Sequence, residues 1–349
     1  MDRVLRVVVV DDSAYVRKVV REILSRSPFV EVVGTARDGR EALDMVAQLD
    51  PDVVTCDLIM PELDGVGFVR EQMARRPVPI IIMSIANETA EAALTALDAG
   101  AIDFVQKPTA LASEKIFEVS TALIEKVKAA GQITLNRMVT VAAPPIATTS
   151  EPATKIAGNH SVDLVAIGIS TGGPQALKRL IPQLPSDFPV PILMVMHMPV
   201  GYTEMYAAKL NELSHLEVKE AAEDDEIKPG RVFLAPAGRH LTVKRDAHGK
   251  VVTHLDARPF NTLHRPAVDV LFESVAEVYR NRVLGVVMTG MGSDGKQGAA
   301  WIKSQGGLVF TEAESSCVVY GMPSAVMEAG LSDQSVALDD MARAIREVV

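Results

Sequence analysis

The chain has 349 residues, of which 48% are hydrophobic, and it carries a formal net charge of -10 at pH 7. The length predicts about two domains, and the acidic balance argues against a nucleic-acid partner, because contacts with phosphates require a basic face. Its only cysteines, Cys56 and Cys317, are too few for a disulfide framework or a zinc site. Every apolar run is strand-sized and the first residues lack the pattern of a secretory signal, so we expect a cytoplasmic protein that does not insert into membranes.

Short β-branched segments alternate with helical patterns over the first part of the chain. Such alternation predicts parallel βαβ units and a doubly wound sheet, which is an α/β fold. The predicted strands are residues 5–10, 30–36, 52–57, 78–84 and 103–108.

Acidic and polar side chains stand where these strands end. Asp11 and Asp12 follow the first strand, and Asp57 ends the third. Ligand sites in open α/β sheets lie at the carboxyl ends of the strands, and clustered carboxylates there attract a divalent cation such as Mg²⁺. Ser84 and Lys107 end two later strands, and a hydroxyl and an ammonium beside an acid cluster suit a phosphoryl group. The alternative is that each acid is merely a solvated loop residue.

The first part of the chain resembles the receiver domain of two-component response regulators in the stretches VVVVDDS, DLIMPELDG, IIIMSI and DFVQKP. The resemblance implies a flavodoxin-like domain over residues 1–128, in which Asp57 accepts a phosphoryl group as an acyl phosphate. It also implies that Mg²⁺ is held by Asp11, Asp12, Asp57 and the backbone carbonyl of Ile59.

The same resemblance assigns a switch to three further residues. Ser84 would bind the phosphoryl oxygens once they arrive, and Lys107 would pair with them. Phe104 occupies the aromatic switch position, and because phenylalanine has no hydroxyl, any switching there rests on packing.

Beyond the receiver, residues 129–160 are rich in Pro, Thr and Ala and have no steady periodicity, which predicts an interdomain linker. A second alternation follows and predicts a larger α/β domain over residues 161–349, again with a doubly wound parallel sheet. The elements predicted there are strands within residues 162–170, 189–197, 230–238, 282–290 and 306–313, an antiparallel hairpin over 240–255 that turns near His248 and Gly249, and an amphipathic helix over 337–349.

The stretch VAIGISTGGPQAL, residues 165–177, places Ser170 at a turn from a strand to a helix. Gly172 and Gly173 free the backbone, and Pro174 suits the first turn of a helix. The turn leaves unpaired backbone N–H groups near the serine. A serine in this position is either a nucleophile or a helix cap.

Two further polar residues are expected at the same edge of this sheet. His197 ends a second apolar strand, and Asp294 lies in the glycine-rich turn after a third. Convergence of Ser170 with these two residues would give the hydroxyl a base and the base an orienting acid. Taken singly, His197 could be a core histidine, and Asp294 could cap the helix that begins near Gly295.

Other families with similar motifs fit less well. Residues 168–172 match the G-x-S-x-G elbow of α/β-hydrolases, but those enzymes run serine, acid, histidine, and no histidine follows Asp294. The spacing of a Rossmann G-x-G-x-x-G and the lysine of a P-loop are both absent from this stretch.

The second domain instead resembles the catalytic domain of the chemotaxis receptor methylesterase, in the stretches IGISTGGP, HMPVGYTEMYAAKLN, LAPAGRHL, HRPAVDVLFES, MTGMGSDG and YGMPSAV. The resemblance implies that Ser170 is the nucleophile, that His197 is the general base and then the acid, and that Asp294 orients the histidine.

The resemblance also places four residues around this centre. The backbone N–H of Met291 would help to form the oxyanion hole, and Thr171 would belong to the edge of the site. His264 and Arg265 match a motif near the cleft, to which no chemical step is assigned.

Together the two resemblances imply a phosphorylation-regulated serine hydrolase of chemotaxis adaptation, which demethylates glutamyl methyl esters on chemoreceptors and deamidates specific receptor glutamines. The expected partners are methylated chemoreceptors and the chemotaxis histidine kinase, the expected state is a monomer, and the ester chemistry is expected to need no cofactor. The alternatives are a receiver-controlled module that binds a protein without catalysis, and a generic esterase of small esters.

Overall fold

A computed structural model describes residues 3–85, 90–107, 114–133 and 161–349, with residues 114–119 described by their backbone alone. The chain divides into two units, residues 1–142 and 143–349, and we describe each by itself. Most of the predicted linker, residues 134–160, lies outside the described residues. In the described part of the chain, no helix is long and apolar enough to cross a membrane.

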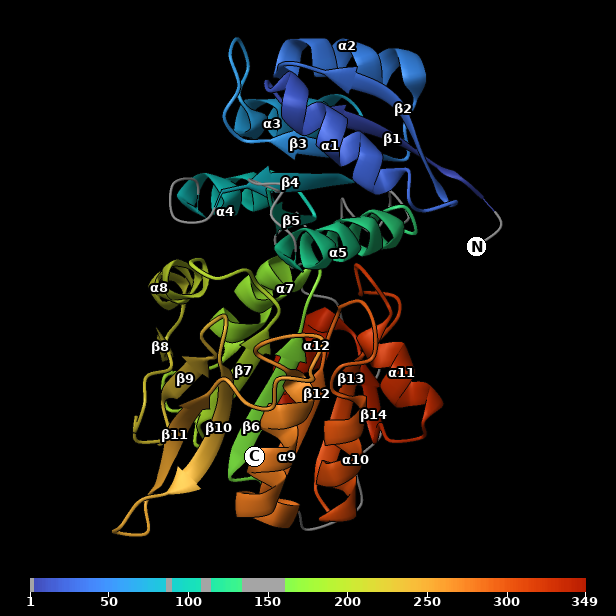
Figure 1. The fold of residues 1–349 in the computed structure, drawn as a ribbon. Coiled ribbons are helices and arrows are strands. Elements are labelled where there is room, and N and C mark those ends of the chain that lie inside the picture. Colours follow the sequence, from blue (N-terminus) through green and yellow to red (C-terminus); the bar gives the residue numbers. More distant parts are fainter. Residues whose placement is uncertain (1–2, 86–89, 108–113, 134–160) are drawn as a thin grey trace. The chain divides into compact units, whose positions relative to one another are not determined.

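In the first unit, strands and helices alternate as the sequence predicts. The elements are β1 (Leu5–Val10), α1 (Ala14–Leu24), β2 (Val30–Ala36), α2 (Gly39–Leu49), β3 (Val53–Asp57), α3 (Gly65–Arg75), β4 (Ile80–Ser84), α4 (Ala90–Asp98), β5 (Asp103–Gln106) and α5 (Glu114–Ala130). The strands form one parallel sheet in the order β2-β1-β3-β4-β5, which is the flavodoxin-like order. α1 packs beside α5, while α3 contacts both α2 and α4, so the predicted doubly wound fold is confirmed (Figure 1).

Local signals bring the start of α3 close to the end of β3. The carboxylate of Asp64 accepts a hydrogen bond of 2.7 Å from the backbone N–H of Gly67 and thereby caps the helix. A Cβ at Gly65 would lie 2.1 Å from the carbonyl oxygen of Asp57, so only glycine permits this approach.

The second unit is built on a larger parallel sheet and a separate hairpin. Its strands are β6 (Leu164–Ile169), β7 (Ile192–Met196), β8 (Glu217–Glu220), β9 (Arg231–Leu234), β10 (His240–Arg245), β11 (Val251–Asp256), β12 (Val283–Val287), β13 (Leu308–Glu312) and β14 (Gln334–Val336). Its helices are α7 (Gly173–Leu180), α8 (Thr203–Leu213), α9 (Val268–Tyr279), α10 (Lys296–Ser304), α11 (Met322–Glu328) and α12 (Leu338–Arg346), with short 3₁₀ turns at Ile181–Gln183 and Arg280–Arg282.

The seven-stranded sheet has the order β14-β13-β12-β6-β7-β9-β8, and every neighbouring pair is parallel. The five predicted strands and the final helix are confirmed. β8 and β14 at the two edges were not predicted, because the segments EVKE and QSV are short and polar and carry no apolar run.

Helices pack against the sheet in two groups (Figure 1). α9 contacts α10, β6 and β10, whereas α7 contacts α8 and α12. The core beneath α9 contains Leu193, Phe233 and Phe272, all fully buried. The parallel pairing of β12 with β6 and of β6 with β7 sets the carboxyl ends of these three strands side by side.

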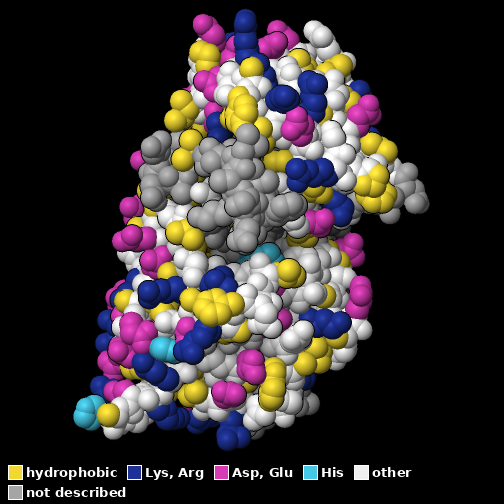
Figure 2. All heavy atoms as spheres, viewed as in Figure 1, with side chains coloured by type: hydrophobic (Ala, Val, Ile, Leu, Met, Phe, Trp, Pro, Cys, Tyr) yellow, Lys and Arg dark blue, Asp and Glu magenta, His cyan; other side chains and the backbone are white. Residues whose placement is uncertain are grey.

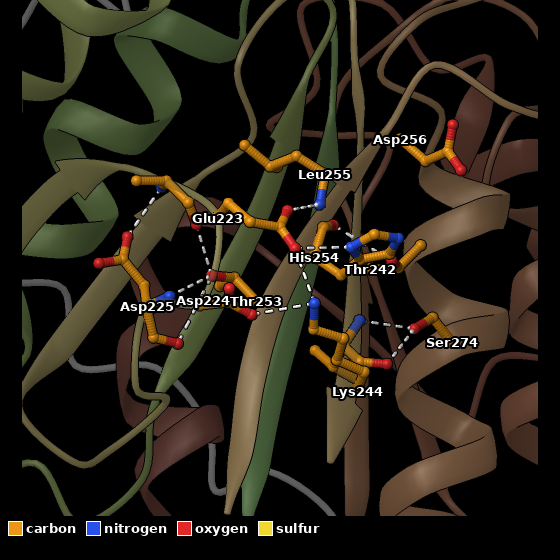
Figure 3. Close-up of polar contacts among 12 residues, drawn as sticks. Glu223, Asp224, Asp225, Thr242, Lys244, Thr253, His254, Leu255, Asp256 and Ser274 are labelled. Atoms are coloured by element: carbon orange, nitrogen blue, oxygen red, sulfur yellow. Dashed lines mark hydrogen bonds and ion pairs between the residues drawn. The ribbon is translucent and has the colours of Figure 1, made fainter. Parts of the chain in front are cut away.

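The predicted hairpin is confirmed as the antiparallel pair β10–β11, and Gly249 takes a φ of 80° in its turn. Figure 3 shows how the segment before β9 holds this hairpin. The carboxylate of Glu223 accepts hydrogen bonds from the backbone N–H of Leu255 at 2.8 Å and from Lys244 Nζ at 2.7 Å, and it pairs with His254 Nδ1 at 2.8 Å.

A buried hydroxyl in β11 completes this anchor. Thr253 Oγ1 accepts a hydrogen bond from the backbone N–H of Asp225 at 2.9 Å and donates one to the carbonyl of Ala222 at 2.6 Å (Figure 3). On the face seen in Figure 2, basic and acidic side chains are interspersed rather than gathered by sign.

Candidate active site

Ser170 lies in the turn between β6 and α7, as the sequence predicts. Gly172, the N-cap residue of α7, has a φ of 81°, and a Cβ there would lie 2.6 Å from Cβ of Val318. Both features require glycine. The helix α7 is capped at Gly172 with no side-chain hydrogen bond, so the alternative that Ser170 is its cap is wrong.

The strand order places Ser170 between the ends of β7 and β12. Ile169 pairs in register with Met196, and the backbone N–H of His197 donates to the carbonyl of Ile169 at 3.1 Å, so the serine and the histidine occupy adjacent register positions. On the other side, a Cβ at Gly290 would lie 2.7 Å from Cβ of Ser170. The glycine after β12 therefore lets this loop approach the serine closely.

His197 and Asp294, which are 97 residues apart in sequence, are joined by a hydrogen bond of 2.8 Å between Nε2 and Oδ2. Burial opposes ionisation of Asp294, but the hydrogen bond and charge of His197, together with backbone N–H donors, outweigh it and lower the pKa of Asp294 to about 2. The carboxylate is therefore ionised and acts only as an acceptor, so the proton of this hydrogen bond is carried by Nε2 of His197. Nδ1 of His197 is buried and has no hydrogen-bond partner among the described residues, which leaves its lone pair available.

Asp294 is fixed by the start of α9 rather than by the helix that follows it. Its Oδ2 accepts from the backbone N–H of Val268 at 2.8 Å, and its Oδ1 accepts from that of Asp269 at 2.9 Å. In return, Oδ1 of Asp269 accepts from the backbone N–H groups of Gly295 and Gly298 at 2.9 and 2.7 Å, at the start of α10. The two aspartates cap each other's helices, so the alternative that Asp294 caps α10 is wrong.

Sequence reasoning missed Asp269. Burial, with the charge of Asp294 nearby, raises the pKa of Asp269 to about 6 against its backbone hydrogen bonds. The sequence shows it only as an acid in the first turn of a helix, and such acids are common there because they complement the helix dipole. Nothing local marks this one as facing a second helix.

His264 belongs to the site more closely than the motif alone indicated. Its ring stacks on the ring of His197, with centroids 3.9 Å apart and planes 22° apart. A cavity of about 690 Å³ lies next to His264, and Asp269 and Asp294 also line it, whereas His197 and Ser170 are not among its lining residues.

Two more of the four residues expected near this centre, Thr171 and Met291, lie close to Ser170 in the chain or in space. Thr171 is buried, and its carbonyl accepts from Thr289 Oγ1 at 3.0 Å. Met291 is half-buried in the loop that carries Asp294, directly after Gly290.

The first unit holds a second candidate site at the ends of β1 and β3. Asp11, Asp12 and Asp57 each offer a carboxylate oxygen, and these oxygens all lie within 4.8 Å of one another. Lys107 Nζ lies 2.7 Å from Asp57 and 2.9 Å from Asp11. Burial raises the pKa of Asp57, although the contact with Lys107 opposes this. Clustered carboxylate oxygens are the donor set that Mg²⁺ prefers, so these residues fit that ion.

The remaining receiver residues named from the sequence lie in β4, in β5 and in the loop after β3. Ser84 is buried at the end of β4, and its carbonyl accepts from the backbone N–H of Lys107 at 2.8 Å. Phe104 is buried in β5. Ile59 lies two residues after Asp57 with an exposed side chain. Their parts in ion binding and switching stay predictions.

Comparison with known proteins identifies the family. Residues 165–345 match the CheB methylesterase family, and residues 7–118 match the response regulator receiver domain. The chain is 49% identical over 348 residues to protein-glutamate methylesterase/protein-glutamine glutaminase 5 of Myxococcus xanthus, with 99% of this chain and 98% of the relative covered. It is 45% identical over 361 residues to the protein-glutamate methylesterase/protein-glutamine glutaminase of Symbiobacterium thermophilum, with 100% and 98% covered. The crystal structure of the CheB methylesterase catalytic domain of Thermotoga maritima matches with a TM-score of 0.53 at 43% identity, covering 54% of this chain and 100% of that one. The chain therefore belongs to the CheB methylesterase family, with a response regulator receiver domain ahead of its catalytic domain.

Proposed function

We propose that this chain hydrolyses methyl esters of glutamate side chains on chemoreceptors and deamidates specific receptor glutamines, under the control of phosphorylation at Asp57. The observation that carries the proposal is the hydrogen bond of 2.8 Å between His197 Nε2 and Asp294 Oδ2, next to the strand end that bears Ser170. It supplies a fixed, polarised imidazole where a serine hydroxyl needs a base.

The first half of the reaction is acyl transfer to the serine. Oγ of Ser170 attacks the ester carbonyl carbon while Nδ1 of His197 takes the hydroxyl proton, since Nε2 is engaged with Asp294. The negative charge of Asp294 stabilises the imidazolium. The backbone N–H of Met291 donates to the oxyanion of the tetrahedral intermediate. The carbon–oxygen bond to the methoxy group then breaks, and Nδ1 returns its proton so that methanol leaves.

The second half regenerates the enzyme. Water attacks the acyl carbon of the ester on Ser170, and Nδ1 of His197 takes a proton from it. The bond to Oγ breaks, Oγ receives the proton, and a glutamate side chain is released. Deamidation uses the same acyl-enzyme, but ammonia leaves in place of methanol.

Control of this chemistry is assigned to the acidic cluster of the first unit. Asp57 accepts a phosphoryl group from a histidine kinase, and Asp11 and Asp12 hold Mg²⁺ with it and with the carbonyl of Ile59. Bound Mg²⁺ offsets the negative charge of the carboxylates and of the incoming phosphoryl group. Lys107 and Ser84 then bind the phosphoryl oxygens, and the new charge of nearly minus two changes the contacts of both. Phe104 responds by a change in packing.

Release of methanol from methyl-labelled receptor membranes tests the proposal. Ser170→Ala should lose about 10⁶-fold in kcat, because removing the nucleophile of a serine hydrolase costs that much. A variant that kept a tenth of the wild-type rate would contradict the proposed nucleophile.

Two controls separate the alternatives. A non-catalytic binding module would release no methanol from any substrate. A generic esterase would turn over a small acyl ester at least as fast as it turns over methylated receptor.

A further inference from the structure

Glu312, at the end of β13, is a fully buried carboxyl group that the reaction above does not use. Its Oε2 accepts a hydrogen bond of 2.9 Å from the backbone N–H of Thr289, the second residue after β12. Its Oε1 accepts one of 3.0 Å from Ser316 Oγ. A carboxyl group without solvent is retained only where its oxygens have partners, and both oxygens have them here.

The partner of Glu312 is the residue that holds Ser170. The carbonyl of Thr289 accepts from the backbone N–H of Ser170 at 2.9 Å, and Thr289 Oγ1 donates to the carbonyl of Thr171 at 3.0 Å. Thr289 Oγ1 also accepts from the backbone N–H of Val319 at 3.0 Å. All the polar groups of Thr289 are therefore occupied, and two of them hold the peptide groups around the nucleophile.

The network around Glu312 is satisfied whether its carboxyl group is charged or neutral. Ser316 Oγ lies 3.2 Å from the carbonyl of Ala313, to which it can donate instead, and it accepts from the backbone N–H of Leu338 at 3.0 Å. A proton on Oε1 can then be donated to Ser316 Oγ, while Oε2 still accepts from Thr289. Burial raises the pKa of Glu312 to about 7 against these hydrogen bonds. The anchor on Thr289 persists in both states.

We infer that Glu312 is a positioning residue of the esterase site, which acts through Thr289 to fix the backbone of Ser170 and the loop that leads to Met291. It touches neither substrate nor reacting atoms. The inference rests on the proposed function, because it gives Ser170 the role of nucleophile. The backbone N–H of Thr289 is buried and needs a hydrogen-bond acceptor, and without one the turn that carries Ser170 shifts.

Three variants of the full chain test this inference. Glu312→Met keeps the length of the side chain but offers Thr289 no comparable acceptor, and Glu312→Asp keeps a carboxyl group that is one methylene too short. Glu312→Gln keeps an amide oxygen for the Thr289 N–H and an amide N–H for Ser316 Oγ. Thr253→Val is the matched control, since it removes another buried hydrogen-bonding group of the same unit, in the hairpin anchor of Figure 3.

Methanol release should separate position from stability. Glu312→Met and Glu312→Asp should lose on the order of 10- to 100-fold in kcat with unchanged KM, since a displacement of about 1 Å can cost 10²-fold. Glu312→Gln should stay within about threefold of wild type. Thr253→Val should lower the unfolding temperature without changing kcat. Wild-type kcat in Glu312→Asp, or equal losses in Glu312→Gln and Glu312→Met, would overturn the inference.

Amide hydrogen exchange supplies a readout that needs no catalytic activity. Exchange in the peptides that contain Ser170 and Thr289 should be faster in Glu312→Asp than in wild type, and unchanged in Glu312→Gln. Equal exchange in all three proteins would overturn the positioning role. If the wild-type chain released no methanol, the proposed function would fail, and the exchange rates would still decide what Glu312 does.

Discussion

Asp294→Asn replaces a carboxylate by an amide of the same shape, and no placement of that amide satisfies every neighbour. Oδ2 of Asp294 receives hydrogen bonds of 2.8 Å from both His197 Nε2 and the N–H of Val268, and Oδ1 receives one of 2.9 Å from the N–H of Asp269. With the amide oxygen in the place of Oδ2, the new NH₂ group faces the N–H of Asp269. With the amide oxygen in the place of Oδ1, the NH₂ group faces the N–H of Val268. Each arrangement sets a donor against a donor.

Two losses follow from this geometry. An unsatisfied donor in a buried site costs about 1–3 kcal/mol of stability. In the second arrangement the NH₂ group also donates to Nε2 of His197, which moves the imidazole proton to Nδ1. The base then holds its proton where the serine needs a lone pair. In both arrangements the imidazolium also loses the negative charge that stabilises it, and an aspartate-to-asparagine change of this kind costs about 10⁴-fold in kcat.

The assay combines methanol release with urea unfolding of the same variant. Asp333→Asn is the control, because the carboxylate of Asp333 likewise accepts from a backbone N–H, that of Val309 at 2.8 Å, and contacts neither His197 nor Ser170. The control should keep wild-type kcat. A kcat within tenfold of wild type for Asp294→Asn would refute the assignment of Nε2 to the carboxylate and Nδ1 to the serine.

Three further predictions concern the other parts of the molecule. His264→Ala removes the ring that stacks on His197 and should lower kcat about 3- to 10-fold, which corresponds to the interaction energy of an aromatic pair. His264→Phe keeps an aromatic ring and should retain most of the wild-type rate. Equal rates in the two variants would contradict a stacking role. The pKa of Glu312 is raised from 4.5 to about 7, first of all by burial, so between these pH values the folded state holds a proton that the unfolded state has released. The contribution of Glu312 to the unfolding free energy should therefore fall by about 3 kcal/mol as pH rises from below 4.5 to above 7. Glu312→Gln should remove that part of the pH dependence in urea titrations, and the same pH dependence in both proteins would contradict the raised pKa. Asp57→Asn should abolish activation by a small phosphodonor with Mg²⁺ while basal methanol release remains, and a variant that still responds would show that another residue is phosphorylated.

The sequence predicts the fold well because most of its strands are buried on both faces. Segments such as residues 164–169 and 283–287 are continuous apolar runs with turn signals on either side, so their identity as strands follows from composition, although the predicted ranges 162–170 and 282–290 extend past their ends. The edge strands β8 and β14 cannot be predicted in this way, because their pairing depends on neighbours that the local sequence does not specify.

Sequence reasoning finds the site residues that directly follow strands, and it misses the residues whose role depends on tertiary contacts. Ser170, His197 and Asp294 stand at the carboxyl ends of three adjacent strands, so topology alone brings them to one edge. The mutual capping by Asp269 and the anchoring of Thr289 by Glu312 depend on how helices and strands from distant parts of the chain pack. No local spacing encodes those contacts.

Activation of Ser170 by His197, held in place by Asp294, can be measured as the rate at which a serine-directed phosphonate labels Ser170, with the labelled residue located by mass spectrometry. We expect labelling at Ser170 in the wild-type chain and a rate lower by about 10²–10⁴-fold in His197→Gln, the range that positioned acid–base catalysis supplies. Labelling of other serines alone, or an unchanged rate at Ser170 in the variant, would contradict this activation.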